Sequence, residues 1–475
     1  MKYKRVVVWF RNDLRVHDHA PLFAAAQNAK EIIPVYCFDP RMFSLEEIGF
    51  AKTGIHRTKF LIEAVENLRE NLKNLGSELI ICQGKPEEEV LRIAEVSEAN
   101  AVFFSEEVTP EEKLVEESLE QNLWKKGIKT EGFWQSTLYH LEDLPFPVSQ
   151  VPEVFTQFRK ECEKYGKIRE TYPNPGTLKF PDLNRDKGEL PDMKYFGLEE
   201  PEPDPRRVLV FKGGEEEGLR RLQTYFWENN CLKDYKQTRN GLLGADYSSK
   251  FSAWLALGCL SPRYIYEEVK RYEKEVKKNQ STYWLIFELI WRDYFRFIAK
   301  KHGSKIFQLQ GIKNDVDNWK RDESLFWKWA NGETGIPFVD ANMRELNATG
   351  FMSNRGRQNV ASFLVNDLEI DWRWGAAYFE SMLIDYDVCS NWGNWMYVAG
   401  VGNDPRENRY FNILRQGQNY DKKGDYVRTW IPELATIPGF DIHIPWDLST
   451  SLLKSCGVSL GGSYPHPMVR FKVYL

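Results

Sequence analysis

The stretch "LIDYDVCSNWGNWMYVAG", residues 383–400, places acids and amides inside an otherwise apolar segment. Burying such groups without partners costs roughly 2–7 kcal/mol each. Asp387, Asn391 and Trp395 are spaced i, i+4 and i+8, so they would share one face of a helix. A carboxylate that accepts from a ring N–H, with an amide one turn later near another ring nitrogen, suits a heteroaromatic cofactor such as flavin. The alternative is a buried polar network that only fixes the helix packing.

A second candidate is "FELIWRDYF", in which Glu288, Trp291 and Arg292 stand at i, i+3 and i+4 on one helical face. These side chains would form a cavity wall, with an acid, a stacking ring and a cation turned toward one ligand. The alternative is a salt bridge beside a packed tryptophan at a domain surface.

A third candidate is "MSNRGRQNVASF", which brings Asn354, Arg357 and Gln358 onto one helical face. Polar side chains that point inward beside an apolar run need partners. We expect Arg357 to pair with Asp385 or Asp387 in a bidentate ion pair, the geometry that guanidinium and carboxylate prefer.

A fourth segment, "GADYSSKFSAW", places Ser248, Ser249, Lys250 and Ser252 just before a helical run. Free backbone N–H groups at such a position attract anions; a serine-rich helix start without a ligand is the alternative. No Walker loop and no GxGxxG motif follows an N-terminal strand, so an ordinary P-loop or Rossmann site is not supported. The seven histidines show no metal-ligand spacing, and we predict no metal site.

The first third of the chain supplies strands and helices in alternation. Short β-branched or aromatic runs suit parallel strands buried on both faces, and the segments between them have the three- and four-residue apolar spacing of crossover helices. We therefore predict an α/β domain over residues 1–138, with a five-stranded parallel, doubly wound sheet. The strand runs are 5–10, 31–38, 78–83 and 100–105, and the helical runs are 56–76 and 86–99.

The character of the chain changes after residue 138. Ten of the 23 prolines lie between Pro145 and Pro205, which predicts a long irregular connector over residues 139–214. From 215 to 475 the pattern is almost wholly helical. Residues 281–303 are apolar nearly all round, so this helix should lie at the centre of an all-α domain.

Composition limits the class of protein. A net charge of −5 gives no argument for nucleic-acid binding, although local clustering of basic residues can still provide it. The seven cysteines are scattered and never form CxxC, as expected for buried thiols in a reducing compartment. No apolar run is long enough to cross a bilayer, and the chain opens directly into a strand. We expect a cytoplasmic protein, not a membrane protein.

Taken together, these stretches resemble the photolyase/cryptochrome family over nearly the whole chain. "VVVWFRNDLRVHDH" is similar to the N-terminal opening of that family. "SSKFSAWLALGCLSPR", "FELIWRDYF", "MRELNATGFMSNRGRQ" and "DWRWGAAYFESMLIDYDVCSNWGNW" are similar to successive parts of its FAD-binding helical domain. In order and spacing these motifs are highly specific.

The resemblance implies roles for individual residues. The FAD-binding set would be Tyr235, Ser248, Ser249, Lys250, Phe251, Ser252, Glu288, Asn354, Arg357, Asp385, Asp387 and Asn391. Lys250 and Phe251 depart from the arginine and leucine of many photolyases. Trp395, Trp372 and Trp319 would form the electron relay of the family, whereas buried tryptophans in general are core residues.

Gln358 and Tyr397 replace the methionine and tryptophan of duplex-DNA photolyases and make the chain resemble DASH cryptochromes. That subgroup implies light-driven repair of cyclobutane pyrimidine dimers in single-stranded or looped DNA by electron transfer from reduced FAD. Glu288, Trp291, Gln358 and Tyr397 would then line the catalytic cavity, and an already unpaired dimer costs least to extrude. The rival functions are a FAD-binding photoreceptor that repairs nothing and an electron-transfer flavoprotein without a DNA role.

The resemblance also implies partners outside the cavity. Arg292 and Arg355 would meet DNA phosphates, which makes binding salt-dependent. Methenyltetrahydrofolate would be the antenna between the domains, with Glu107 as its contact; a solvated acidic helix start is the alternative for "SEEVTPEE". No obligate protein partner is indicated, and we expect a monomer.

Overall fold

A computed structural model describes residues 1–183, 186–313, 319–406 and 409–471. Its N-terminal region contains one sheet in which every described strand pairing is parallel and the strand order is β3-β2-β1-β4-β5. The predicted five-stranded parallel sheet is therefore confirmed. The strands are β1 (Tyr3–Phe10), β2 (Ala29–Phe38), β3 (Ile80–Gln83), β4 (Ala101–Ser105) and β5 (Lys129–Phe133).

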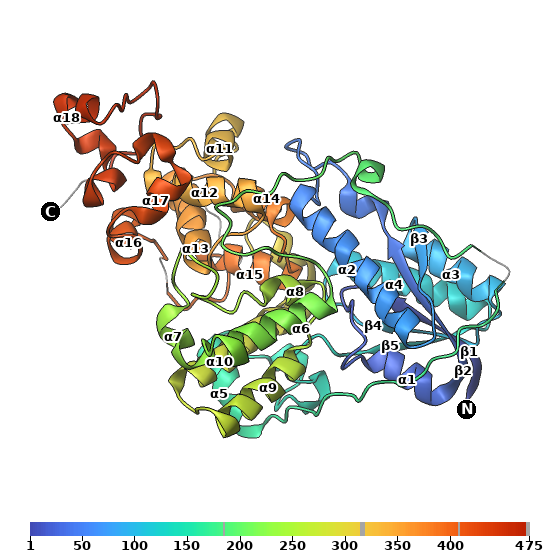
Figure 1. The fold of residues 1–475 in the computed structure, drawn as a ribbon. Coiled ribbons are helices and arrows are strands. Elements are labelled where there is room, and N and C mark those ends of the chain that lie inside the picture. Colours follow the sequence, from blue (N-terminus) through green and yellow to red (C-terminus); the bar gives the residue numbers. More distant parts are fainter. Residues whose placement is uncertain (184–185, 314–318, 407–408, 472–475) are drawn as a thin grey trace.

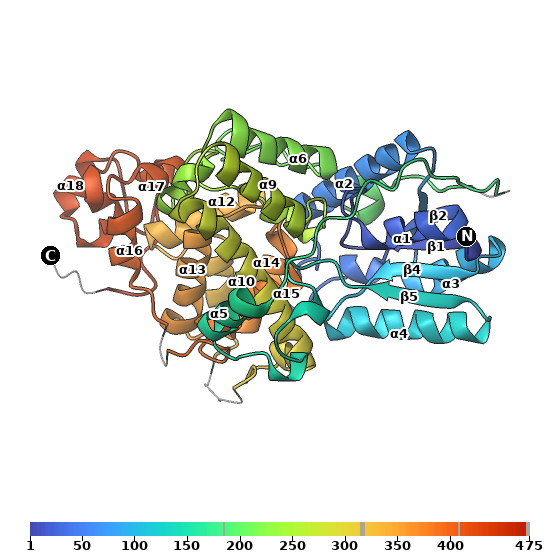
Figure 2. The ribbon, with the colours of Figure 1, turned by 90° about the horizontal axis from the view of Figure 1, so that it is seen from below.

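Helices cover both faces of this sheet (Figures 1 and 2). Val6 and Val8 of β1 belong to a core that includes residues of α1 and α2, whereas Val7 and Trp9 pack with α3 and α4. Because side chains alternate along a strand, a strand buried on both faces is apolar at every position. The helices are α1 (Ala20–Asn28), α2 (Ile55–Asn74), α3 (Pro86–Val96) and α4 (Pro110–Lys125).

The connector runs along the outside of the N-terminal domain (Figure 1), where the backbone N–H of Ile32 donates to Lys179 and that of Ile81 to Lys187. It also contains helix α5 (Phe155–Tyr165), which the proline content did not predict. The buried residues of α5 are Phe155, Phe158 and Cys162, spaced i, i+3 and i+7, and this stripe packs toward α10. The domain boundaries at 138 and 214 stay a prediction.

The C-terminal region is helical, as predicted. Its centre is α10 (Gln280–His302), which contacts α5, α7, α9 and α15 and begins at a capping box on Asn279. The other α-helices are α6 (Glu215–Gln223), α7 (Tyr235–Thr238), α8 (Ser252–Ala256), α9 (Pro262–Glu275), α11 (Glu323–Ala330), α12 (Pro337–Thr349), α13 (Asn354–Ser362), α14 (Trp372–Met382), α15 (Val388–Val398), α16 (Ile413–Tyr420), α17 (Asp425–Trp430) and α18 (Thr450–Ser455).

The two regions share a continuous buried core. Arg263 of α9 forms a buried ion pair with Asp18 from the loop after β1. Buried Asp293 of α10 accepts the backbone N–H groups of Leu138 and Tyr139 at 2.9 and 2.8 Å. Among the described helices, none is long and apolar enough to cross a membrane, and within the same residues no cluster of metal-ligating side chains occurs.

Candidate cofactor and substrate site

A cavity lies among α13, α14 and α15. Two of the four stretches identified from the sequence, residues 352–363 and 383–400, meet there. The lining residues are Asn354, Arg357, Gln358, Ala361, Phe379, Leu383, Asp385, Tyr386, Asp387, Ser390, Asn391, Asn394, Trp395, Tyr397, Val398 and Arg409.

Helix α15 presents the predicted polar face to this cavity. Asp387 is its N-cap and accepts the backbone N–H of Ser390 at 2.8 Å. Asn391 and Trp395 follow one and two turns later, and all three predicted residues line the cavity. The Asn391 side-chain amide donates to the Ala376 carbonyl of α14 at 3.0 Å, which fixes its orientation.

Helix α13 forms the facing wall. It begins after Ser353, whose hydroxyl accepts the N–H of Gly356 at 3.0 Å. Arg357 donates from Nη2 to Asp385 Oδ2 at 2.9 Å, which confirms the predicted pairing with one of the two aspartates. The pair is not bidentate as predicted, because Arg357 Nε donates to the Met352 carbonyl instead.

The surroundings of two cavity side chains determine their protonation states. Although burial favours the neutral acid, the guanidinium groups of Arg292 and Arg296 hold the pKa of Asp387 below its ordinary value. Asp387 is therefore a carboxylate at neutral pH. Burial, with the nearby Asp404 carboxylate, raises the pKa of Tyr397 to about 12, so its hydroxyl keeps its proton.

Trp291 lies next to the cavity without being one of its lining residues. Its ring is 5.8 Å from that of Tyr397, edge to face, so two of the residues predicted for the catalytic cavity are in contact. One face of the Trp291 ring is covered by Phe155 of α5, with ring centroids 3.5 Å apart and planes 11° apart. Phe155 therefore sets the plane of the tryptophan.

Glu288, one turn before Trp291, forms an ion pair with Arg239 from the segment after α7. Burial raises the pKa of Glu288, and the Arg239 charge opposes this shift. The next residue, Asn240, accepts from Arg355 Nη2 at 3.0 Å, while Arg355 Nη1 donates to Gln358. Arg239 and Asn240 thus link Glu288 of α10 to Arg355 of α13.

Comparison with known proteins decides the family. Residues 284–474 match the family described as the FAD binding domain of DNA photolyase, and residues 6–176 match the one described as DNA photolyase. The chain belongs to the photolyase/cryptochrome family. Cryptochrome DASH of Xenopus laevis is 54% identical over 467 residues, which cover 98% of this chain and 89% of that protein.

Two solved structures of this photolyase/cryptochrome family show how far the fold is shared. The Synechocystis sp. PCC6803 cryptochrome is 54% identical, with a TM-score of 0.95 over 99% of this chain and 98% of that one. An archaeal photolyase from Sulfolobus tokodaii, solved with two FAD molecules, is 28% identical, with a TM-score of 0.79 over 98% and 96% of the two chains.

The cavity fits the FAD of a photolyase/cryptochrome FAD-binding domain. Asp385 Oδ1 is buried and has no hydrogen-bond partner among the described residues, so it lacks a donor that a flavin ring N–H supplies. Five of the predicted cofactor residues line this cavity: Asn354, Arg357, Asp385, Asp387 and Asn391.

The predicted phosphate-contacting residues of the family lie elsewhere. Tyr235 and residues 248–252 do not line this cavity. Helix α8, which begins at Ser252, has five residues, so the expected anion attraction of a helix start gains no support. Lys250 Nζ donates to the Ala245 carbonyl at 2.7 Å and lies over the Tyr247 ring, and burial lowers the pKa of Lys250 to about 6. These cofactor contacts stay predictions.

The guanidinium of Arg292 donates to the backbone carbonyls of Ser136, which follows β5, and of Leu255 in α8. It therefore holds these two segments against α10. Its predicted contact with DNA phosphates stays a prediction. Arg355 is half-buried beside the Tyr420 ring. Its contact with DNA phosphates stays a prediction.

The relay residues of the family occupy different depths. Trp395 lines the cavity, Trp372 is fully buried, and Trp319 is half-buried. Trp372 donates to the Leu309 carbonyl at 3.1 Å, and its ring lies 5.7 Å from that of Trp392. The relay itself stays a prediction.

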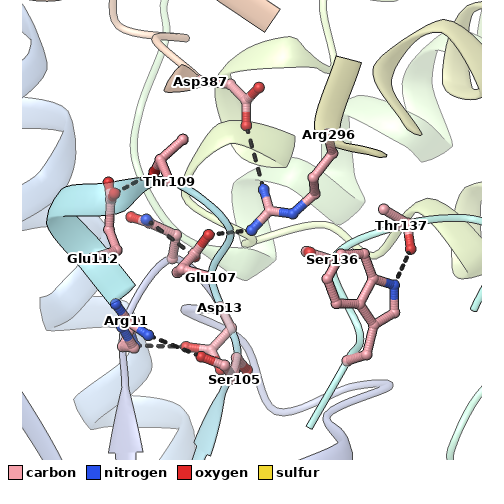
Figure 3. Close-up of polar contacts among 12 residues, drawn as sticks. Arg11, Asp13, Ser105, Glu107, Thr109, Glu112, Ser136, Thr137, Arg296 and Asp387 are labelled. Carbon is pink, nitrogen blue, oxygen red and sulfur yellow. Dashed lines mark hydrogen bonds and ion pairs between the residues drawn. The ribbon is translucent and has the colours of Figure 1, made fainter. Parts of the chain in front are cut away.

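Glu107, the predicted antenna contact, is buried and forms an ion pair with Arg296 of α10 (Figure 3). For Glu107 the alternative of a solvated acid is wrong, because the residue is 4% exposed. Further along the same segment, Glu111 and Glu112 do form the acidic first turn of α4, and the Glu111 side chain is exposed. Sequence reasoning missed Phe155, Arg239 and Arg296. Each lies far along the chain from its partner, and no local pattern marks such a pairing.

Proposed function

We propose that this chain is a deoxyribodipyrimidine photo-lyase of the DASH type, which uses light to repair cyclobutane pyrimidine dimers in single-stranded or looped DNA. The observation that carries the proposal is the pairing of Trp291 with Tyr397 at 5.8 Å, beside the cavity that fits FAD. Glu288 stands one turn from Trp291 on the same helix. An acid and two aromatic rings are the groups that a flipped pyrimidine dimer needs.

FAD would be held by the cavity residues of α13 and α15, together with the residues that the family resemblance adds. The chemistry that FAD would supply there, when reduced and photoexcited, is the donation of one electron to the dimer and its recovery after the ring has opened. Trp291 would stack on the dimer, and Glu288 would hydrogen-bond the pyrimidine and stabilise charge that develops on it.

Gln358 and Tyr397 would set the substrate preference. They form a more polar wall than methionine and tryptophan would. Binding in the cavity therefore recovers less of the free energy that flipping a dimer out of duplex DNA costs. For enzymes that act on flipped bases, photolyases among them, that cost is a few kcal/mol and is smallest for bases already unpaired. A dimer in a single strand or loop is therefore the preferred substrate.

The antenna would be methenyltetrahydrofolate, with Glu107 beside its site. A second cavity opens at the carboxyl ends of β1 and β2 and also contacts Leu257 of the helical region. Asn12 lines this cavity, and its Nδ2 lies 3.5 Å from Glu107 Oε1. A folate absorption band that Glu107→Gln weakens, beside an unchanged flavin band, would support this assignment; an absorption spectrum after reconstitution with the folate measures it.

The deciding experiment illuminates the chemically reduced protein with an oligothymidine that contains dimers. We expect the absorbance of intact thymine to recover in the light and not in the dark. Glu288→Gln should lower the repair rate about 100-fold, as removal of one charge-stabilising group does. The matched control is Glu275→Gln on α9, an exposed carboxylate far from the cavity, which should repair like the wild type. Dimers that persist under illumination would contradict the proposal and favour the photoreceptor alternative.

A further inference from the structure

One guanidinium lies between the two domains (Figure 3). Arg296, on α10, donates from Nη2 to Glu107 Oε2 in the loop that follows β4. Its Nη1 lies 3.8 Å from Asp387 Oδ2, at the start of α15. The side chains of Arg296 and Glu107 are about 5% exposed and that of Asp387 is 12% exposed, so solvent screens these charges weakly.

The two carboxylates belong to different sites. Asp387 lines the cavity that fits FAD. Glu107 belongs to the N-terminal domain, where its backbone N–H donates to Glu116 at 2.7 Å and its carboxylate adjoins Asn12 of the second cavity. Arg296 therefore faces one carboxylate from each domain, and the charge of Arg292 also acts on Asp387.

The guanidinium is not held by a complete set of hydrogen bonds. Arg296 Nε is buried and has no acceptor among the described residues. The contact with Glu107 is a direct hydrogen bond, whereas the approach to Asp387 is longer than one. A cation between two carboxylates moves toward whichever remains charged, since attraction falls with distance and is strong where water is excluded.

We infer that Arg296 is a positioning residue that couples the two domains: it divides its charge between Glu107 and Asp387, so that the state of Glu107 determines how much positive charge faces the flavin. When Glu107 loses its charge, Arg296 is released toward Asp387 and the cavity becomes less negative. The anionic reduced flavin is then favoured over the neutral oxidised flavin. This inference depends on FAD binding and not on dimer repair, so loss of repair activity leaves it standing.

The test measures the flavin midpoint potential of the FAD-loaded protein without DNA. In Glu107→Gln we expect the affinity ratio of reduced to oxidised flavin to rise about tenfold, which is about 30 mV for a two-electron couple. Glu106→Gln is the matched control, because it removes the preceding carboxylate of the same loop, for which the described residues give no ion pair. In this control the affinity ratio of reduced to oxidised flavin should change less than threefold.

The same substitution is then made where Arg296 no longer carries charge. In an Arg296→Gln background, Glu107→Gln should shift the ratio by less than threefold, whereas in Arg296→Lys most of the tenfold effect should return. A merely structural role would change stability and leave the potential in place. The inference is overturned if Glu106→Gln shifts the potential as much as Glu107→Gln does. It is also overturned if the tenfold effect survives in Arg296→Gln; should that variant not fold, the comparison of the two glutamates decides alone.

Discussion

At the residue scale, the site contains a polar atom that the described part of the chain does not satisfy. Arg357 satisfies one oxygen of Asp385, and the other oxygen is buried without a donor among the described residues. Leaving such an atom unpaired costs about 1–3 kcal/mol, more for a charged group. A ligand that donates to it recovers that cost, so the cavity gains affinity from a defect in its own hydrogen bonding.

Asp385→Asn tests this account of the cavity. The substitution removes the charge that Arg357 meets and replaces one acceptor by a donor. A hydrogen bond to a charged group is worth about 1.5–3 kcal/mol, so the FAD dissociation constant should rise roughly 10- to 150-fold. Fluorescence titration of the apoprotein with FAD measures this.

Asp367→Asn is the control for that measurement. Asp367 also has a buried oxygen without a partner among the described residues, but it does not line the cavity. The FAD affinity of the Asp367→Asn variant should equal that of the wild type. Equal losses in the two variants would show that the effect is general destabilisation.

At the element scale, the connector contributes more than a link between domains. Helix α5 brings Phe155 against Trp291, and its loop brings Glu153 against Lys301 near the end of α10. The proline-rich composition predicted irregular backbone and was uninformative about this helix. An apolar stripe of three residues is too short a signal to separate a docked helix from a loop.

Phe155→Ala should weaken binding of a dimer-containing single strand about tenfold, because the plane of Trp291 is no longer fixed. It should also lower the free energy of unfolding by about 3–5 kcal/mol, the usual loss for a buried phenylalanine. Phe158→Ala is the matched control: Phe158 lies one turn later on α5 and is fully buried against Tyr294 and Phe297. It should cost similar stability without changing dimer affinity, as binding assays and urea unfolding can show.

Asp13, at the carboxyl end of the sheet, should make the free energy of unfolding depend on pH. Burial alone would raise the pKa of Asp13, but His19 and hydrogen bonds from Ser105 and the Arg11 backbone lower it to about 2. A carboxyl group with a depressed folded pKa stabilises the fold above its unfolded pKa, and this stability is lost as pH falls through the folded value. Between pH 4 and pH 2 the wild type should lose about 2 kcal/mol through this group.

Asp13→Asn removes that titration. The variant should be less stable at pH 7, and its unfolding free energy should change less between pH 4 and pH 2 than that of the wild type. Urea unfolding at each pH measures the difference. An identical pH profile in both proteins would rule out Asp13 as the source.

At the scale of the whole molecule, buried charges hold the two domains together. Asp18 accepts from Arg263 of α9 and from the Ser261 hydroxyl, and the Tyr172 N–H donates to it at 2.9 Å. These contacts join the loop after β1 to the helical domain and to the connector. The sites on either side of the interface are thereby held in fixed relation, as coupling through Arg296 requires.

Asp18→Asn should lower the free energy of unfolding by about 3–5 kcal/mol, because it leaves Arg263 buried without a counter-ion. Asparagine tolerates the positive φ of 44° at this position, so the backbone is not strained by the change. Lys270→Met, which breaks an ion pair to Glu273 on the same α9, should cost no more than about 1 kcal/mol. Equal effects in thermal or urea unfolding would contradict a special role for the interdomain pair.

The sequence by itself determined the fold class, the polar faces of α13 and α15, and the pairing of Arg357 with an aspartate. Helical spacing decides which side chains share a face, and apolar runs decide which strands are buried on both sides. The tertiary structure alone decided that Glu288 meets Arg239, that Phe155 covers Trp291, and that Arg296 stands between Glu107 and Asp387. These partners lie 49 to 189 residues apart in the chain, and no periodicity in a sequence specifies which distant segments pack together.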